Sequence, residues 1–289
     1  MKKDILSFID ENISDFSKGQ RQIASYIKEH YDKAAFMTAA RLGREVGVSE
    51  STVVRFVLEF GFEGYPEFQK ALQELIRSKL TSVQRVEVTD NLIGNSSVLD
   101  KVLGSDIEKI KTTLEGIDRV AFDDAVKQII SAENIYIVGM KASSYLAGLL
   151  NHSLRMIFDN VRHIQTTSGS ETFEQMMNVG KGDVVIAVSF PRYSKSVIRV
   201  ADYAKRAGAD IIAITDSESS PLAENATQLL IAQSDMASFA DSLVAPMSVI
   251  NALIVAVARA CKEQLSERLH GLEQVWDEYN VYQSATSDK

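Results

Sequence analysis

The chain has 289 residues, of which 45% are hydrophobic and 24% are charged, so it is long enough for two folded domains and too apolar for an intrinsically disordered protein. Its one cysteine, Cys261, excludes an internal disulfide and favours a cytoplasmic location. The formal net charge is -8, yet the first 80 residues carry equal numbers of acidic and basic side chains. Nucleic-acid binding there would therefore depend on a local basic patch.

The N-terminal part of the chain has helical periodicity almost throughout its first 80 residues. No apolar run follows Met1, Lys2 and Lys3, which predicts that there is no signal peptide. Apolar residues then recur at helical spacing, beginning with Ile5 and Ile9. Three residues are placed to cap the start of a helix: Ser17, with Gln20 completing a capping box, then Thr38 and Ser49. A further helix is predicted to begin near Pro66.

The rest of the chain has a different pattern, which predicts a second domain. Residues 81–97 lose the periodicity and gain polar and turn residues, so we expect an interdomain linker between domains at 1–80 and 98–289. Strands are predicted at 135–139, 161–164, 183–189, 210–215 and 228–232, each followed by a helix-length segment. This alternation predicts a doubly wound parallel sheet, hence an α/β domain after an all-α one. The apolar run 243–258 contains Pro246 and is too short for a membrane span, so we expect a core helix.

Residues 47–62, "GVSESTVVRFVLEFGF", begin with polar residues and continue almost wholly apolar. Two short helices joined by a tight turn at Gly47 predict a helix-turn-helix, whose second helix enters the DNA major groove with its first residues toward the bases. Its apolar stripe is predicted to be Val53, Phe56, Val57 and Phe60. The predicted DNA contacts are Ser49, Glu50, Ser51, Thr52 and Arg55. The alternatives are that Ser49 only caps the helix and that Arg55 is an ordinary surface residue.

Serine-rich turns follow three of the predicted strands. Ligands of open parallel sheets bind beyond the carboxyl ends of the strands, where hydroxyls, helix N-terminal amides and cations would hold a phosphate. The predicted effector-binding residues are Ser143, Ser144, Glu171, Ser189, Arg192, Ser194 and Lys195. Each serine taken alone is more typical of a helix cap. Neither a Walker A pattern nor a GxGxxG pattern occurs, which disfavours nucleotide binding.

An enzyme and a purely architectural protein remain as alternatives. Sugar-phosphate isomerisation needs a carboxylate base and often a histidine, for which Glu171 with His152 or His163 would be the candidates. A glutamate that opens a helix is more often there for the helix dipole. The four histidines lack metal-ligand spacing, so neither a metal nor another cofactor is expected. The serine turns would have no purpose in an architectural protein.

The two halves together resemble the RpiR-type bacterial transcription regulators, which join an N-terminal helix-turn-helix domain to a C-terminal sugar isomerase (SIS) domain of flavodoxin-like fold. The resemblance rests on "QRQIASYIKEH", on "AFMTAARLGREVGVSESTVVRFVLEFGFEGYPEFQKAL" and on the turns "IYIVGMKASS" and "VVIAVSFPRYSKS". It implies a regulator whose affinity for operator DNA is modulated by a phosphorylated sugar or a related small molecule. A homodimer or tetramer is expected, because palindromic sites mirror two-fold proteins.

The resemblance also carries residue roles over to this chain. The family's recognition positions fall on Glu50, Ser51, Thr52 and Arg55, and its effector serines fall on Ser143, Ser189 and Ser194, with Ser144 adjacent. Both turns depart from the family pattern. The second glycine of the first turn is Lys141 here, and Pro191-Arg192 replaces a serine and a glycine in the second turn. These changes remove a hydroxyl and a position of close backbone approach, for which Arg192 and Lys195 would compensate with charge.

Overall fold

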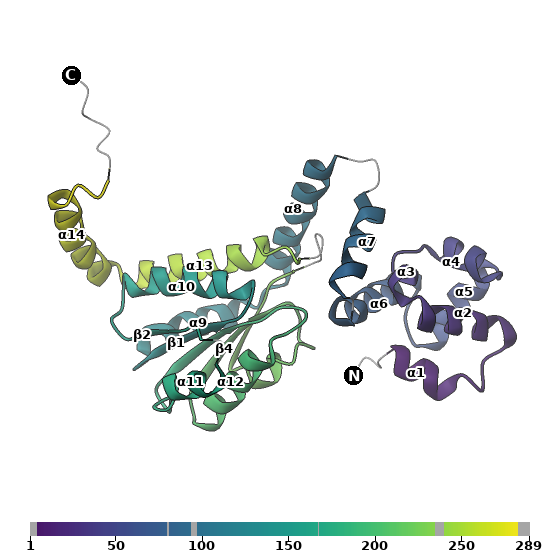
Figure 1. Cartoon of the computed structure of the whole chain (residues 1–289), viewed down its shortest axis with the longest axis horizontal. Helices are drawn as coiled ribbons and strands as arrows, with labels where there is room; N and C mark the ends of the chain where they lie inside the picture. Colours follow the sequence, from purple (N-terminus) through teal and green to yellow (C-terminus); the bar gives the residue numbers. More distant parts are fainter. Residues whose placement is uncertain (1–4, 80, 94–96, 167, 235–239, 283–289) are drawn as a thin grey trace, which may run out of the picture. The chain divides into compact units, whose positions relative to one another are not determined.

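The computed structural model describes residues 5–79, 81–93, 97–166, 168–234 and 240–282. It divides into two compact units (Figure 1). The helical unit comprises Met1–Lys101 with Met236–Asp241, and the sheet unit comprises Val102–Asp235 with Ser242–Lys289.

The helical unit packs short helices around one aromatic core. Its helices are α1 (Ile5–Asn12), α2 (Lys18–Glu29), α3 (Tyr31–Ala34), α4 (Ala39–Val46), α5 (Glu50–Glu59), α6 (Tyr65–Lys79) and α7 (Ser82–Ile93). The three predicted caps are confirmed, because the hydroxyls of Ser17, Thr38 and Ser49 each accept a backbone N–H from the residue three positions on. Ser17 and Gln20 form the predicted capping box. In the core, the rings of Phe16 and Phe56 meet edge to face at 5.4 Å.

Helix α7 lies in the stretch whose loss of apolar periodicity led to the linker prediction, and the sequence analysis did not predict this helix. The helix starts from a capping box in which Thr81 and Gln84 exchange bonds, Thr81 N–H to Gln84 Oε1 at 3.0 Å and Gln84 N–H to Thr81 Oγ1 at 3.3 Å. The apolar periodicity is weak because the buried face of α7 contains an arginine. Arg85 is buried and forms an ion pair with Asp241 at 2.9 Å. That residues 81–97 act as the interdomain linker stays a prediction.

The sheet unit contains one parallel five-stranded sheet of order β2-β1-β3-β4-β5. Its strands are β1 (Ile135–Gly139), β2 (Val161–Ile164), β3 (Val184–Val188), β4 (Asp210–Thr215) and β5 (Gln228–Ile231), which confirms all five predicted strands to within a residue at each end. Every residue of β1 and β3 is buried, as expected for central strands covered on both faces.

Helices cover both faces of this sheet (Figure 1). One face packs against α9 (Arg119–Ser131), α10 (Ser143–Arg155) and α13 (Val244–Ala260), and the other packs against α11 (Gly169–Gln175) and α12 (Lys195–Arg206). The unit also contains α8 (Val98–Gly116), which begins in the helical unit, the short η1 (Ala223–Asn225) and α14 (Lys262–Glu278). The predicted α/β fold class is confirmed.

The apolar run that was predicted to be a core helix is α13, and its buried residues include Val249, Ile250 and Leu253. Among the described residues, no single helix combines the length and the apolar composition of a membrane span. Helices α13 and α14 meet those criteria only when taken together, across a bend of 95° between them.

Candidate functional sites

The turn between α4 and α5 depends on two glycines. Gly47 ends α4 in the left-handed region at φ 74°, and the Val48 N–H donates back to the Gly43 carbonyl at 2.8 Å. A side chain at Gly43 would meet the Val48 carbonyl oxygen at 2.8 Å, which is closer than real Cβ contacts come. The turn therefore lies directly against α4, which is the tight connection that a helix-turn-helix requires.

Helix α5 separates its polar start from an apolar face. Val53, Phe56 and Val57 are fully buried, and Phe60 packs edge to face on Phe56 at 4.8 Å, which confirms the predicted stripe. The residues predicted to contact DNA lie on the other side: Ser49, Glu50, Ser51 and Arg55 are exposed, and Thr52 is half-buried. Their accessibility is what DNA contact requires, and the contacts themselves stay predictions.

Ser49 caps α5 and also organises its first turn. Its Oγ accepts the Thr52 N–H at 3.2 Å and lies 2.9 Å from Ser51 Oγ and 2.8 Å from Thr52 Oγ1. Arg55 Nε donates to the Ser51 carbonyl at 3.3 Å, which draws the guanidinium toward the same turn. Three hydroxyls and one cation are thus grouped at a helix N-terminus, and this chemistry suits phosphate oxygens.

Helix α2 adds a cation that the sequence did not single out. A Cβ at Gly19 would lie 3.5 Å from both Thr52 and Val48, so the first turn of α2 packs beside the start of α5. Lys18, the first residue of α2, is exposed there. In the sequence, the sign of this contact between α2 and α5 is the small residue Gly19. A small residue indicates close helix packing only once the neighbouring helix is known.

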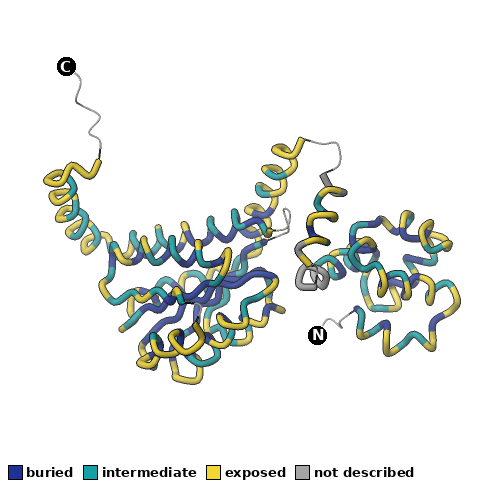
Figure 2. The backbone as a smooth tube through the Cα atoms, viewed as in Figure 1, coloured by how far each residue is buried: buried dark blue, intermediate teal, exposed yellow. Residues whose placement is uncertain are grey.

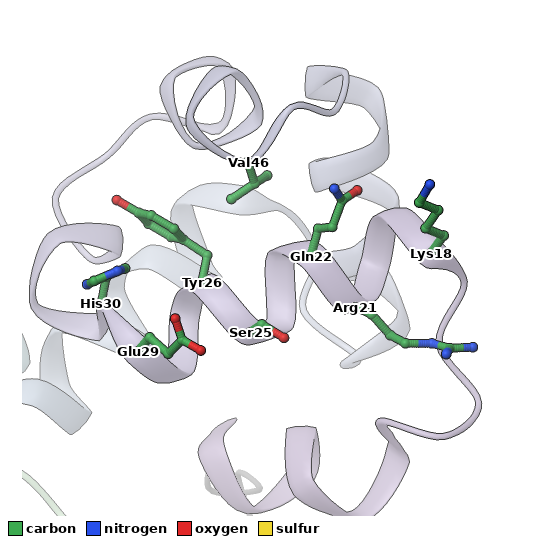
Figure 3. A pocket seen from close by; sticks show the side chains of 8 residues that line it. All are labelled: Lys18, Arg21, Gln22, Ser25, Tyr26, Glu29, His30 and Val46. Atoms are coloured by element: carbon green, nitrogen blue, oxygen red, sulfur yellow. The ribbon is translucent and has the colours of Figure 1, made fainter.

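A broad concavity of about 710 Å³ lies between α2 and the end of α4 (Figure 3). Lys18 and Arg21 lie at one end of it, while Glu29 and His30 lie at the other. Because the lining contains both basic and acidic side chains, the concavity as a whole favours neither anions nor cations. Its basic end adjoins the start of α5.

The strand order predicts a ligand site at the carboxyl end of the sheet. After β1 the chain adds β2 on one side of it and then β3, β4 and β5 on the other side, so the strand order switches between β1 and β3. These two strands are direct neighbours, with Gly139 opposite Val188. The turns after these two strands therefore leave the sheet side by side. Open parallel sheets bind their ligands at such a switch point.

The first of these turns, after β1, is closed by tight backbone contacts. A Cβ at Gly139 would lie 2.5 Å from the Ser143 carbonyl oxygen, so α10 packs directly on the end of the strand. Lys141 adopts a left-handed conformation, with φ 55°. Ser144 Oγ donates to the Lys141 carbonyl at 2.6 Å, whereas Ser143 is buried as the first residue of α10. Neither serine is the N-cap of α10, a position that Ala142 occupies.

The second turn, after β3, is closed by Ser189, whose buried Oγ accepts the Ser194 N–H at 3.2 Å. Ser194 is the N-cap residue of α12, yet its side chain makes no capping hydrogen bond. Arg192, like Lys141, is left-handed, with φ 63°. The structure therefore assigns Ser189 a part in holding the turn, while a role for either serine in effector binding stays a prediction.

Tyr193 ties this turn to the next strand. Its hydroxyl donates to Asp216 Oδ1 at 2.9 Å, just beyond the end of β4. Burial, together with the charge of Asp216, raises the pKa of Tyr193, so the hydroxyl stays protonated and remains the donor. The turns after β3 and β4 are thus joined by a side-chain hydrogen bond, and the sequence alone did not reveal this link.

Glu171 is engaged in holding its own loop. Thr166 Oγ1 donates to Glu171 Oε2 at 2.6 Å, and Gln175 Nε2 donates to Glu171 Oε1 at 3.2 Å. Arg192 and Lys195 are exposed. Both ring nitrogens of His163 are buried and have no hydrogen-bond partner, and His152 is exposed on α10. Within the described part of the chain, no group of His, Cys, Asp and Glu side chains could hold a metal ion.

Comparison with known proteins assigns both units. Residues 3–79 match the helix-turn-helix domain model of the rpiR family, and residues 128–256 match the SIS domain model. The chain belongs to the RpiR family. This RpiR-family chain is 26% identical over 231 residues to the HTH-type transcriptional regulator HexR of Pseudomonas aeruginosa, covering 79% of this chain and 78% of HexR.

Solved structures agree with this assignment. The sugar isomerase domain of an RpiR transcription factor from Sphaerobacter thermophilus is 27% identical, with a TM-score of 0.57, over 60% of this chain and 97% of that one. The Vibrio vulnificus NanR protein, solved in complex with ManNAc-6P, is 24% identical, with a TM-score of 0.58, over 96% of this chain and 99% of NanR. At this identity the NanR likeness shows the shared fold.

Proposed function

We propose that this RpiR-family protein is a cytoplasmic transcription regulator whose affinity for operator DNA changes when a phosphorylated sugar, or a related phosphorylated molecule, binds in its SIS domain. One observation carries the proposal. A single chain combines a helix-turn-helix whose polar tip is exposed with a sheet whose switch point carries serines and cations. HexR and NanR, which resemble it, are a named regulator and a protein complexed with a phosphosugar.

The effector site we propose is formed by the turns after β1 and β3. Ser143 and Ser194 each lie at the start of a helix without being used as a side-chain cap, so their hydroxyls and the helix amides can share one anion. Lys141, Arg192 and Lys195 are exposed around them and supply positive charge. A phosphate bound there would connect two turns that are separate in the sequence.

Binding at this edge would be transmitted to DNA through an oligomer. We propose a homodimer or tetramer in which the effector alters the spacing of two helix-turn-helix units, and hence their fit to a palindromic operator. In the DNA-bound state Ser49, Glu50, Ser51, Thr52 and Arg55 would face the major groove.

An isomerase activity is the second candidate, because the SIS fold occurs in enzymes, including a putative sugar-phosphate isomerase from Listeria monocytogenes that has 19% identity and a TM-score of 0.50. A regulator without catalysis is better supported here. Glu171, the one candidate base, accepts hydrogen bonds through both carboxylate oxygens from side chains of its own loop and helix. The named relatives are regulators.

The proposal is tested first by a thermal-melting screen against phosphosugars, each paired with its unphosphorylated sugar. A ligand that binds only the folded state adds about 2.7 kcal/mol to the free energy of unfolding at a hundredfold excess over Kd. We expect a shift from a phosphorylated compound alone. Conversion of that compound in an overnight incubation would support the isomerase instead, and shifts from both members of a pair would reject the phosphate site.

DNA binding is tested separately with duplexes selected from a random-sequence pool. Arg55→Ala should weaken binding to the selected duplex at least tenfold, because a base or phosphate contact to Arg55 is lost. Arg206→Ala removes another exposed arginine, from α12 in the sheet unit, and serves as the control. Equal affinities of the two variants would remove Arg55 from the interface.

A further inference from the structure

Helix α2 carries a row of exposed hydrogen-bond donors, which we call the donor row. Its members are Lys18, Arg21, Gln22 and Ser25, which follow one another along the helix in Figure 3. Positions i, i+3, i+4 and i+7 share one side of a helix. The opposite side of α2 is apolar and packs in the core of the helical unit, so buried and exposed residues alternate along this helix in Figure 2.

The two cations of the donor row are not paired within their own chain. In the part of the chain that the structure describes, neither Lys18 nor Arg21 forms an ion pair, whereas Lys28 of the same helix is paired with Asp10 of α1. Arg21 Nε donates to the Phe16 carbonyl at 2.7 Å, which holds this side chain near the start of α2. The start of the helix therefore presents two positive charges to an external anion, and its end does not.

Packing fixes the donor row beside the predicted DNA-reading helix. A Cβ at Gly19 would lie 3.5 Å from Thr52 in the first turn of α5, and Gln20 Nε2 donates to Glu59 Oε2 at 2.6 Å in its last turn. The start of α2 is thus held to α5 at two points. The donor row extends the group of three hydroxyls and Arg55 at the start of α5.

We propose that the donor row binds the sugar-phosphate backbone of one DNA strand beside the bases that α5 faces, an inference that rests on the proposed operator binding. Every residue type in the row donates hydrogen bonds to phosphate oxygens in protein–DNA complexes. From Lys18 to Ser25 the row runs about 10 Å along α2. Phosphates of one strand recur about every 3.4 Å along the DNA axis, so the row can reach at least two of them.

The charges of α2 also set where this contact ends. Glu29 is exposed on the same side of the helix, four residues after Ser25, and it lines the far end of the concavity in Figure 3. A carboxylate repels phosphate, so the strand leaves α2 between Ser25 and Glu29. The helical unit, whose first 80 residues have no net charge, thereby obtains the local basic patch that DNA binding requires.

The first test is the salt dependence of binding to the duplex selected from the random-sequence pool. Each phosphate contact adds about 0.9 to the slope of log affinity against log salt concentration. Lys18→Ala/Arg21→Ala should therefore reduce the magnitude of the slope by about 1.8. It should weaken binding to the selected duplex and to an unrelated one by the same factor, because phosphate contacts do not read sequence. Lys18→Arg/Arg21→Lys keeps both charges and should keep the parent slope.

Lys28→Ala is the matched control, because it removes a cation of the same helix that is already paired. Its slope should equal that of the parent. An unchanged slope in Lys18→Ala/Arg21→Ala, or an equal fall in Lys28→Ala, would overturn the inference while leaving DNA binding by the parent intact. Failure of the parent to bind any duplex would reject the proposed function and this inference with it.

The second test locates the contact on the DNA. A methylphosphonate linkage, which removes one backbone charge, is placed at each position of the selected duplex in turn. The parent should lose affinity at two neighbouring positions of each half-site where Lys18→Ala/Arg21→Ala loses none, because a direct contact appears as coupling between the two changes. If the double variant keeps the full pattern of the parent, the donor row does not touch the backbone.

Discussion

At the scale of single residues, the two turns of the candidate effector site share an unusual feature. Lys141 and Arg192 both adopt the left-handed region, at φ 55° and 63°. This region costs a non-glycine residue about 1 kcal/mol or more. They are also the two positions at which the RpiR pattern has glycine. Both turns thus keep a left-handed residue, although a cationic residue stands in place of each glycine. This replacement is explained if the positive charges bind the phosphate of the ligand.

Changing Lys141 to glycine or to alanine would separate strain from charge. Lys141→Gly should leave stability within about 1 kcal/mol of the parent or raise it, since relief of strain offsets the more flexible unfolded chain. Lys141→Ala should keep the strain. Both variants should bind the effector found by the melting screen several-fold more weakly. Titration of each variant checks the affinity, and parent-like affinity in both would mean that Lys141 does not face the ligand.

His163 gives the sheet unit a pH-dependent stability. Burial lowers its pKa below the usual value of about 6.5, because the neutral ring is favoured where neither nitrogen has a partner. The unfolded chain then binds the proton more tightly than the folded chain. The contribution of the neutral His163 ring to the free energy of unfolding is therefore complete above about pH 6.5 and is lost as the pH falls below that value.

Replacing His163 with leucine should reduce this acid sensitivity. The drop in melting temperature between pH 7.5 and pH 5.5 should be smaller in His163→Leu than in the parent, because the proton-binding difference is removed. His152→Leu, which changes an exposed histidine on α10, should behave like the parent. If the two variants show the same pH dependence, His163 is not its source.

At the scale of elements, two glycines let helices approach other backbone closely. Because Gly43 has no side chain, the turn of the helix-turn-helix packs closely against α4. Gly139 in the same way lets the first turn of α10 pack against the end of β1. In both places the added Cβ would meet a backbone oxygen, at 2.8 Å and 2.5 Å respectively. Backbone atoms cannot rotate away as a flexible side chain can. Each element junction is therefore sensitive to one methyl group.

Gly139→Ala should destabilise the sheet unit by roughly 1–3 kcal/mol, because the start of α10 must move away from the strand. Gly148→Ala, within α10, is a matched control. Its nearest neighbour would be the His163 ring at 3.8 Å, so the change should be neutral or stabilising by about 1 kcal/mol. Urea denaturation measures both. Equal stabilities would show that the β1–α10 junction can relax.

Gly139→Ala should also weaken effector binding more than its loss of stability explains, because the Ser143 amide and hydroxyl move with α10. Comparing effector affinity well below the melting temperature separates the two effects. Full affinity in a destabilised variant would place the phosphate away from the turn after β1.

At the scale of the whole molecule, the proposed function requires that binding of the effector in one unit and binding of DNA in the other are coupled in free energy. If the effector changes operator affinity by some factor, the operator must change effector affinity by the same factor. We expect the two factors to agree within error when measured at one salt concentration, because phosphate contacts make DNA affinity depend on salt. Fluorescence anisotropy for DNA and calorimetry for the effector supply the two numbers. A change in one direction only would show that the titrations report different assemblies.

Much of the architecture follows from local patterns in the sequence. The caps at Ser17, Thr38 and Ser49, the stripe of α5 and the five strands depend on interactions between near neighbours or on the periodicity of burial, which a sequence displays directly. Helix α7 was missed because its signal was the Thr81–Gln84 capping box rather than an apolar stripe. That Ser189, Ser194 and Glu171 lie in segments that follow parallel strands also came from the alternation of strands and helices in the sequence.

Long-range packing decided the rest. No local pattern shows that Tyr193 donates to Asp216, that Lys18 lies beside the start of α5, or that α8 buries Lys109 and exposes Ile107. Each depends on residues brought together from distant parts of the chain. An amphipathic helix specifies that it has two different sides, but its neighbours determine which side faces inward. For α8 those neighbours are Ser242 and Gln233, more than a hundred residues away in the sequence.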